Sequence, residues 1–270
     1  MDWVPEFYST TGRWWAPALA AVGEQERARA ELVGRICGPG PYRILELGAG
    51  YGNTAAALAE RGHQVTAVEI SDRAEHAERH AGPRLRVVHD DFYAVQLPGD
   101  HDVVCYFNGF GIGTDADQRR LLRRISAEWL RPGGHALIDV MNPFVWARWA
   151  GDREHRDADP ARGYAYTVDE RTDFDPVHSR YTDTWWETDR PDDAITQVGR
   201  CYTPADLMLL LEGTDLAVAR LFVDGIELDL DGDHVGHAPL LHQAHEYLAV
   251  LRHTAASAAQ TRRSQPVSGR

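Results

Sequence analysis

The chain has 270 residues, of which 43% are hydrophobic, so it can bury a full core in one large domain. Its net charge is −13 and all 28 basic residues are arginine. This excludes a lysine Schiff base and argues against a nucleic-acid partner, which would need a positive surface. There is no membrane-spanning run, recognisable signal peptide or CxxC pair, so we expect a cytoplasmic protein with reduced thiols and no membrane partner.

The first part of the chain predicts a helical segment followed by alternating strands and helices. Residues 1–40 are rich in aromatic side chains and end at a Gly-Pro break, which indicates a helical N-terminal segment. Helices are expected after Gly52 and after Thr114, which is a good N-cap. Apolar strands are expected at residues 44–47, 65–69, 85–89, 103–107 and 136–140. Such alternation predicts a parallel sheet covered by helices on both faces, hence an α/β fold.

The pattern changes between residues 150 and 202, where polar and apolar side chains alternate. β-rich runs at 166–174, 180–187 and 196–202 are separated by proline-containing turns, which predicts an antiparallel insert. The main pattern resumes with a helix at 207–211 and strands at 218–223 and 247–251. We therefore expect one domain over residues 1–253, and a disordered tail at 254–270.

A glycine-rich turn follows the first strand, at Gly48, Gly50 and Gly52. Such a turn lets a ligand approach the backbone closely and points helix N–H groups at it, although an ordinary tight turn looks similar. Glu46 lies inside the apolar strand, where a buried carboxylate needs a partner. Glu69 ends the next strand, at the place where an acid can accept from ribose hydroxyls. The glycine spacing differs from the G-x-G-x-x-G of dinucleotide-binding folds.

These residues resemble motifs of the class I methyltransferases that use S-adenosylmethionine (SAM). Residues 46–52 are similar to motif I, Glu69 to the acid of motif II, residues 89–92 to the adenine-contacting segment, and residues 130–134 to the loop before the fifth strand. The resemblance covers about residues 40–142. It implies SAM as the cofactor and a Rossmann-like sheet of seven strands in the order 3-2-1-4-5-7-6, with the insert between strands 5 and 6 and the last strand antiparallel.

The resemblance also implies how the cofactor is held. Glu46 would engage the SAM amino group, the glycines would pass beneath the aminoacyl arm, and Glu69 would hold the ribose. Asp91 would accept from adenine with Phe92 against the ring, although Asp91 can also be a helix cap or loop acid, with Asp90 as its competitor. Phe107 and Asn108 would face the sulfonium. The expected cofactor-binding residues are Tyr8, Arg13, Glu46, Gly48, Gly50, Gly52, Asn53, Glu69, Ile70, Asp91, Phe92, Phe107 and Asn108.

The N-terminal segment and the insert are expected to shape the reacting end. Relatives carry a lid helix where residues 1–40 lie; there Arg13 would pair with the methionine carboxylate, and Tyr8 is the candidate catalytic group. Alternatively, the tryptophans of this segment only pack it onto the domain. In the insert, one of two adjacent tryptophans must face away from the other, so one lines a pocket and the other packs a core or a homodimer. The expected substrate-binding residues are Trp14, Asn142, Tyr181 and Trp185.

The function that we expect is SAM-dependent methylation of a small aromatic or heterocyclic metabolite in bacterial secondary metabolism. N-, O- and C-methylation all stay open. We expect no metal, because Asp139 and Asn142 do not form the acid pattern of catechol-type enzymes, and the histidines from His234 to His245 match no standard metal spacing. The alternatives are a tRNA or protein methyltransferase, for which residues 119–124 are the only arginine cluster, and a catalytically idle SAM-binding protein.

Overall fold

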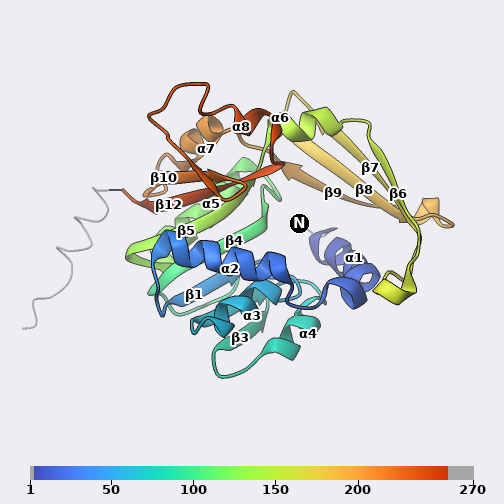
Figure 1. The fold of residues 1–270 in the computed structure, drawn as a ribbon, viewed down its shortest axis with the longest axis horizontal. Helices are drawn as coiled ribbons and strands as arrows, with labels where there is room; N and C mark the ends of the chain where they lie inside the picture. The colour runs from blue at the N-terminus through green and yellow to red at the C-terminus, as the bar shows by residue number, and fades with distance from the viewer. Residues whose placement is uncertain (1–2, 255–270) are drawn as a thin grey trace, which may run out of the picture.

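The computed structural model describes residues 3–254 and contains a central sheet of eight strands (Figure 1). The strands are β1 (Arg43–Leu47), β2 (Gln64–Glu69), β3 (Leu85–His89), β4 (His101–Phe110), β5 (Leu130–Met141), β10 (Leu216–Val223), β11 (Ile226–Leu228) and β12 (Glu246–His253). Their order is β11-β10-β12-β5-β4-β1-β2-β3. The neighbours from β3 to β5 pair in parallel, and β12 runs antiparallel to β5 and β10. The predicted Rossmann-like sheet is confirmed; β11 was not predicted, because three residues carry too little pattern.

Helices cover both faces of this sheet. On one face, α2 (Glu24–Cys37) and α3 (Asn53–Glu60) form a core with β1 and β4, and α4 (Ala74–Ala77) follows β2. On the other face of the same strands, α5 (Asp115–Arg124) and α7 (Pro204–Leu211) form a second core with the sheet. This two-sided burial explains why the strands are apolar throughout.

The join between α5 and β5 differs from the prediction. After the helix that follows Thr114, the sequence predicts a loop at residues 130–134, before the fifth strand. Instead α5 ends at Arg124 in a π-helical turn, Ile125–Trp129, and β5 begins at Leu130. Leu130 pairs with His101, and the register then shifts before His135, so the Pro-Gly-Gly residues bulge out of the strand.

A second, antiparallel sheet lies beyond β5, at the right of Figure 1. Its order is β6-β7-β8-β9, with β6 (Arg153–Arg156), β7 (Val168–Asp175), β8 (Arg180–Glu187) and β9 (Ile195–Arg200). The sequence did not predict β6, because its four residues are all charged or polar and exposed, without alternation. The short helices α6 (Pro143–Trp146) and α8 (Pro239–His242) lie near its junction with the central sheet.

The N-terminal helix α1 (Trp3–Leu19) packs on this second sheet. Trp14 and Trp15 are buried in a cluster with Val168 of β7, and Trp14 Nε1 donates to Glu187 at 3.0 Å. The opposite side of α1 contacts the glycine-rich turn, where the Tyr51 hydroxyl donates to the Gly12 carbonyl at 3.1 Å. Helix α1 therefore bridges the second sheet and the glycine-rich turn.

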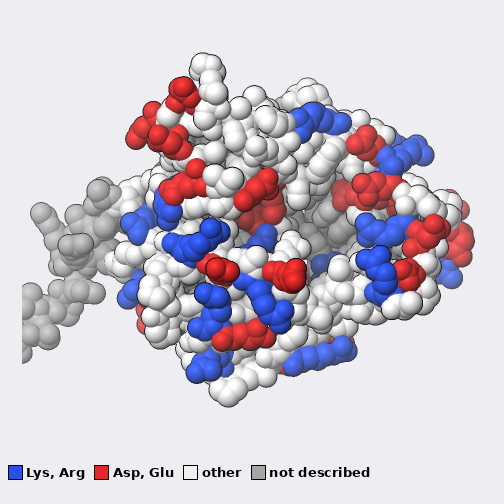
Figure 2. Space-filling view, viewed as in Figure 1, with Lys and Arg blue, Asp and Glu red and all other residues white. Residues whose placement is uncertain are grey.

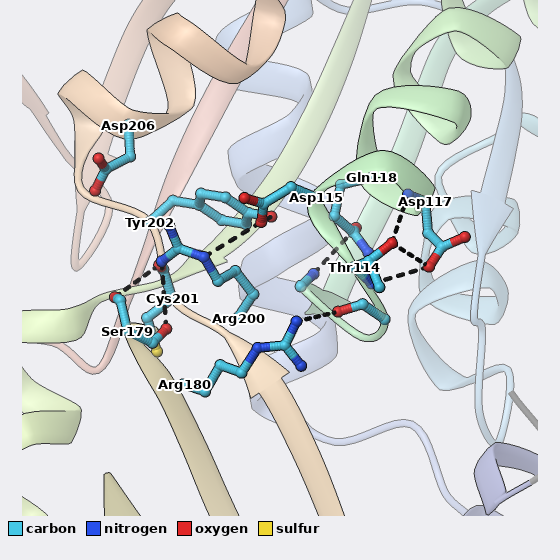
Figure 3. A network of polar contacts seen from close by, with 12 residues as sticks. Thr114, Asp115, Asp117, Gln118, Ser179, Arg180, Arg200, Cys201, Tyr202 and Asp206 are labelled. Carbon is cyan, nitrogen blue, oxygen red and sulfur yellow. Dashed lines mark hydrogen bonds and ion pairs between the residues drawn. The ribbon is translucent and has the colours of Figure 1, made fainter. Parts of the chain in front are cut away.

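The second sheet joins the domain through a polar network at the start of α5 (Figure 3). Asp115 accepts from the Tyr202 hydroxyl at 2.8 Å and pairs with Arg200 Nε at 3.2 Å. Arg200 also donates to the carbonyls of Ser179 and Cys201. Gly111 fits here because a Cβ would lie 2.2 Å from the Arg200 carbonyl oxygen. The end of β9 is thus held against the loop between β4 and α5.

Two predictions from the sequence concern the C-terminal residues and membrane-spanning helices. The tail predicted at residues 254–270 lies, beyond Thr254, outside the described residues. Within residues 3–254, the longest helices are too short or too polar to qualify as a membrane span. The division into one domain with a lid and an insert stays a prediction.

Candidate active site

A cavity of about 510 Å³ lies at the carboxyl ends of β1, β2 and β4. This edge of a parallel sheet is where ligands bind in open α/β folds. The predicted residues that line the cavity are Tyr8, Glu46, Gly48, Gly50, Asn53, Glu69, Ile70, Asp91, Phe92, Phe107 and Asn108. The structure thus brings most of the predicted cofactor-binding residues into one cavity.

The glycine-rich turn is bonded directly to the acid at the end of β2. The backbone N–H of Gly50 donates to Glu69 Oε2 at 2.7 Å, while the backbone and side chain of Ser71 donate to Oε1 at 2.8 and 2.5 Å. Glu69 is buried yet lines the cavity; Oε1 already accepts two hydrogen bonds, and Oε2 accepts one and has a further lone pair to offer. Gly50 has φ 56°, and a Cβ there would meet no heavy atom within 4 Å. The space above the turn is therefore available to a ligand.

Glu46 lies on the floor of the cavity with one oxygen unsatisfied. The residue is 3% exposed, and its Oε2 has no hydrogen-bond partner among the described residues. Burial raises the pKa of Glu46 to about 8, against the lowering effect of Arg29. Because an unpaired buried carboxyl is costly, this oxygen is suited to an N–H donor of a ligand. The SAM amino group is such a donor, so the residues present fit SAM.

Aromatic side chains form the end of the cavity beside β3. Asp91 lines the cavity there, and its Oδ1 accepts from the backbone N–H of Tyr93 at 2.7 Å. The Phe92 ring lies 4.8 Å from that of Tyr93 and 5.3 Å from that of Tyr106. A flat ring beside Phe92 would have aromatic neighbours and a carboxylate at its edge.

The opposite end of the cavity, beside β4, is charged and tightly packed. Arg29 of α2 lies 4.6 Å from the Phe107 ring centre and pairs with Asp139 at 2.8 Å and Glu246 at 3.3 Å. Asn108 has φ 55°, a left-handed conformation that asparagine adopts more readily than most non-glycine residues. With its amide oriented to satisfy both neighbours, Asn108 donates to Glu246 at 2.8 Å and accepts from Arg29 at 3.1 Å.

Burial changes the acidity of this cluster. The pKa of Asp139 rises to about 7 because the carboxyl is buried and lies close to Glu246, although Arg29 opposes the shift. Burial also raises the pKa of Glu246. One arginine thus serves two carboxyls, which favours the retention of a proton near neutral pH.

Arg73 binds helix α1 beside the cavity. Its guanidinium lies between two rings, 5.1 Å from the centre of Tyr8 and 4.9 Å from that of Tyr51. It donates to the Tyr8 carbonyl at 2.9 Å and to the Thr11 hydroxyl at 2.6 Å. The Tyr8 hydroxyl donates to Gln197 of β9 at 3.3 Å, and burial raises the pKa of Tyr8 to about 12. Tyr8 is therefore protonated at neutral pH and lies at the cavity as a neutral group.

Two of the expected cofactor contacts need correction. Arg13 is exposed and donates to Thr10 at 3.1 Å; it does not line the cavity, so its expected pairing with the methionine carboxylate is not supported by its position. Successive helix residues point in different directions, and at this position α1 faces solvent. Gly52 does not line the cavity either. It packs closely against Ala77, because a Cβ at position 52 would lie 2.7 Å from that of Ala77.

The four expected substrate-binding residues do not line the cavity either. Trp14 is buried against the second sheet, as the packing alternative predicted. Asn142 caps α6 and donates to the carbonyls of Leu240 and Ala244. Tyr181 stacks on Trp146 with ring centres 4.2 Å apart, and Trp185 packs against Trp15 at 5.8 Å. Each of these side chains therefore packs or caps within the protein instead of lining the cavity.

Sequence reasoning missed the two arginines that matter most here. Arg29 precedes the buried residues Val33 and Ile36 by four and seven positions, so helical spacing places it on the inner face of α2. Arg73 follows Glu69 by four residues, beyond the strand end that the motif search covered. Within residues 3–254, no group of three or more His, Cys, Asp or Glu side chains is arranged to hold a metal ion.

Comparisons with known proteins agree with this geometry. Residues 44–134 match the family described as a methyltransferase domain. The cypemycin N-terminal methyltransferase of a Streptomyces species is 32% identical over 114 residues, which are 40% of this chain and 46% of that protein, so less than half of the relative is matched.

Solved structures resemble the fold over nearly its whole length. The CcbJ methyltransferase from Streptomyces caelestis has a TM-score of 0.70 at 20% identity, over 92% of this chain and 99% of that one. A SAM-dependent methyltransferase from Clostridium acetobutylicum has a TM-score of 0.68 at 13% identity, over 92% of this chain and 100% of that one. Residues 44–134 thus match a methyltransferase domain, and the fold resembles that of SAM-dependent methyltransferases over nearly the whole chain.

Proposed function

We propose that the protein transfers the methyl group of SAM to a small molecule held between α1, the β4 end of the cavity and the second sheet. The observation that supports this most is the unpartnered, buried Oε2 of Glu46 beneath the open space above Gly50. This arrangement suits the amino group of an aminoacyl ligand, and Glu69 lies beside it with carboxylate oxygens for a ribose.

SAM supplies a methyl group that is already activated by its sulfonium. The protein therefore has to align the acceptor with this methyl and exclude water. Phe107 and Tyr106 are buried walls of the cavity and offer ring faces, which attract a cation. Tyr8 enters the cavity from the lid and can donate or accept a hydrogen bond at the acceptor, but its raised pKa makes it a poor base. We propose that the transfer is metal-independent, because these roles need only alignment, aromatic walls and proton acceptance.

The names of the neighbours favour nitrogen as the methylated atom. Structural neighbours include an amino pentose methyltransferase from Micromonospora echinaspora and a sugar N-methyltransferase from Streptoalloteichus, each with a TM-score of 0.57. We extend this to the chain as a proposal: a small metabolite with an amine or hydroxyl. An aromatic or heterocyclic acceptor stays a prediction. A second candidate is a peptide with a free N-terminus, which the name of the matched Streptomyces relative supports.

Two further parts of the proposal concern partners. Charged side chains of both signs are intermixed over the face shown in Figure 2, and the net charge is −13, which supports a substrate other than nucleic acid. We also propose that the second sheet forms a homodimer, because its edge strand β6 has one side on which backbone groups can pair with another chain. Sedimentation analysis tests the homodimer. Methylation of small acceptors at a rate that does not change with salt concentration would support a substrate other than nucleic acid.

The experiment that tests the cofactor site is calorimetry with SAM and S-adenosylhomocysteine on Glu46→Gln and Glu69→Gln. Both variants should bind more weakly than the wild type. Glu60→Gln is the matched control, since Glu60 is 56% exposed and pairs with Arg27 on the surface. A methyl-transfer assay on amines, alcohols and N-terminal peptides then shows turnover. SAM binding that is unaffected in both variants, or bound SAM that is never consumed, would contradict the proposal.

A further inference from the structure

The carboxylate of the SAM aminoacyl group needs a cation, and Arg13 does not line the cavity where it would bind. Three other arginines do line it, namely Arg29, Arg73 and Arg120. An α-amino-acid head group carries its ammonium and its carboxylate on one carbon atom, so the residues that hold these two groups must be neighbours. Because Glu46 offers its unpartnered Oε2 to the ammonium, the cation for the carboxylate should lie beside Glu46.

Arg29 is the arginine that lies beside Glu46. Its positive charge acts on the Glu46 carboxyl and opposes the rise in pKa that burial causes there. Arg73 is taken up by its contacts with α1, to which it donates two hydrogen bonds. Arg120 donates to the carbonyl of Tyr93, at the end of the cavity beside β3. Of the three arginines, Arg29 therefore fits the carboxylate best.

Two of the five N–H groups of Arg29 have no acceptor among the described residues. Nη2 donates to Asp139 at 2.8 Å and to Glu246 at 3.3 Å, and Nη1 donates to the amide oxygen of Asn108 at 3.1 Å. The Nε–H and one N–H of Nη1 remain. The side chain is only 16% exposed, so donors without an acceptor are costly there unless a ligand accepts from them.

Asp139 and Glu246 hold Arg29 from the side away from the cofactor. Both acids line an adjoining cavity of about 480 Å³, and neither lines the cofactor cavity. Arg29 and Phe107 line both cavities, so they form the wall between the two. The three charged residues lie outside residues 44–134, the part of the chain that matches the methyltransferase-domain family. The arginine is thus fixed from one side and open to a ligand on the other.

From this geometry we propose that Arg29 binds the carboxylate of the SAM aminoacyl group. The inference rests on the proposed function, because it takes SAM as the cofactor. Glu46 accepts from the ammonium on the same carbon atom, so the two residues recognise both charges of the head group. The charges balance, since Asp139 and Glu246 retain one proton between them and match Arg29 once, while the zwitterionic head group adds no net charge.

Ligands that differ only in the carboxylate test this by calorimetry on the full-length protein. S-adenosylhomocysteine is compared with its decarboxylated analogue, which keeps the amine, and with 5′-methylthioadenosine, which lacks the whole head group. The wild type should bind S-adenosylhomocysteine about 10–100-fold more tightly than the decarboxylated analogue. This comparison needs no substitution, so it does not depend on how a variant folds.

Two substitutions then assign the preference for the carboxylate to Arg29. Arg29→Gln should remove the preference. Arg29→Lys, which keeps the charge but not the planar guanidinium, should restore part of it. Neither variant should weaken the binding of the decarboxylated analogue or of 5′-methylthioadenosine, because these ligands have no carboxylate to lose.

The matched control is Arg73→Gln, because Arg73 also lines the cavity but donates to α1. It should weaken the binding of both S-adenosylhomocysteine and the decarboxylated analogue by the same factor. The inference is overturned if the wild type binds these two ligands equally, if Arg29→Gln keeps the full preference, or if Arg73→Gln removes it. Failure of the wild type to bind S-adenosylhomocysteine would instead overturn the proposed function, so the two failures are distinguishable.

Discussion

The backbone N–H of Gly50 donates to the carboxylate of Glu69 at 2.7 Å, so the two strongest sequence motifs form one bonded unit. The turn after β1 is held in place by the residue that is expected to hold the ribose. Glu69 therefore stabilises the backbone of this turn, in addition to its expected contact with the ribose.

Substituting Glu69 by Gln should damage cofactor binding more than it damages folding. The Gln side chain has only one acceptor oxygen, so either Gly50 or Ser71 would face an N–H group instead of an acceptor. Loss of a charge-assisted bond at a buried site costs about 2 kcal/mol. Calorimetry with SAM and thermal unfolding check this; unchanged SAM affinity would count against the assignment of Glu69.

Substituting Gly50 by Ala should weaken SAM binding beyond the strain that it introduces. Both Gly50 and Gly62 have positive φ, and a Cβ at either position meets no protein atom within 4 Å. The strain at the two sites should be similar, about 1 kcal/mol. Only the Cβ at position 50 enters the cavity, so Gly62→Ala should bind SAM normally. Equal SAM affinities of the two variants would refute the placement of the cofactor.

Substituting Glu46 by Gln should make the protein more stable at high pH while weakening SAM binding. The pKa of Glu46 is about 8 in the folded protein, against an ordinary value of 4.5, so folding takes up a proton between these pH values. The wild type should lose stability, relative to the variant, as the pH rises through this window. Below it the two should melt alike. Melting curves across this range measure the effect, and a difference that does not depend on pH would contradict it.

Substituting Arg73 by Gln should release the lid. The variant loses the bonds to Tyr8 and Thr11 and both ring contacts, which together are worth about 2–3 kcal/mol locally. Trypsin should then cleave faster after Arg13, which is exposed in α1, and the KM for SAM should rise. The control Arg79→Gln removes an exposed arginine near the same turn and should change neither. Equal cleavage rates in the two variants would show that Arg73 does not fasten the helix.

The cofactor half of the site could be predicted because its constraints are local in sequence. Glu46, Gly50 and Glu69 each lie at a strand end, where parallel pairing brings consecutive motifs to the same edge of the sheet. The order of the seven main strands followed from the resemblance to the class I methyltransferases. For these residues, distance along the chain was enough to infer distance in space.

The rest of the site could not be predicted, because its contacts join segments that are far apart in the chain. Arg29 meets Asp139 and Glu246 across 110 and 217 positions, and nothing in the pattern of α2 names such partners. Trp14 and Trp185 were expected at the substrate because they are aromatic. The same property makes them good packing residues, and only the fold decides between the two uses.

The anchoring of the second sheet at Asp115 has a consequence for how such proteins diverge. The polar contacts in Figure 3 hold the end of β9 to the loop before α5, while the inner face of the sheet looks toward the lid. Substitutions on that inner face leave the contacts of Asp115 with Tyr202 and Arg200 in place. The side chains of the inner face can therefore change while the second sheet keeps its attachment to the central sheet.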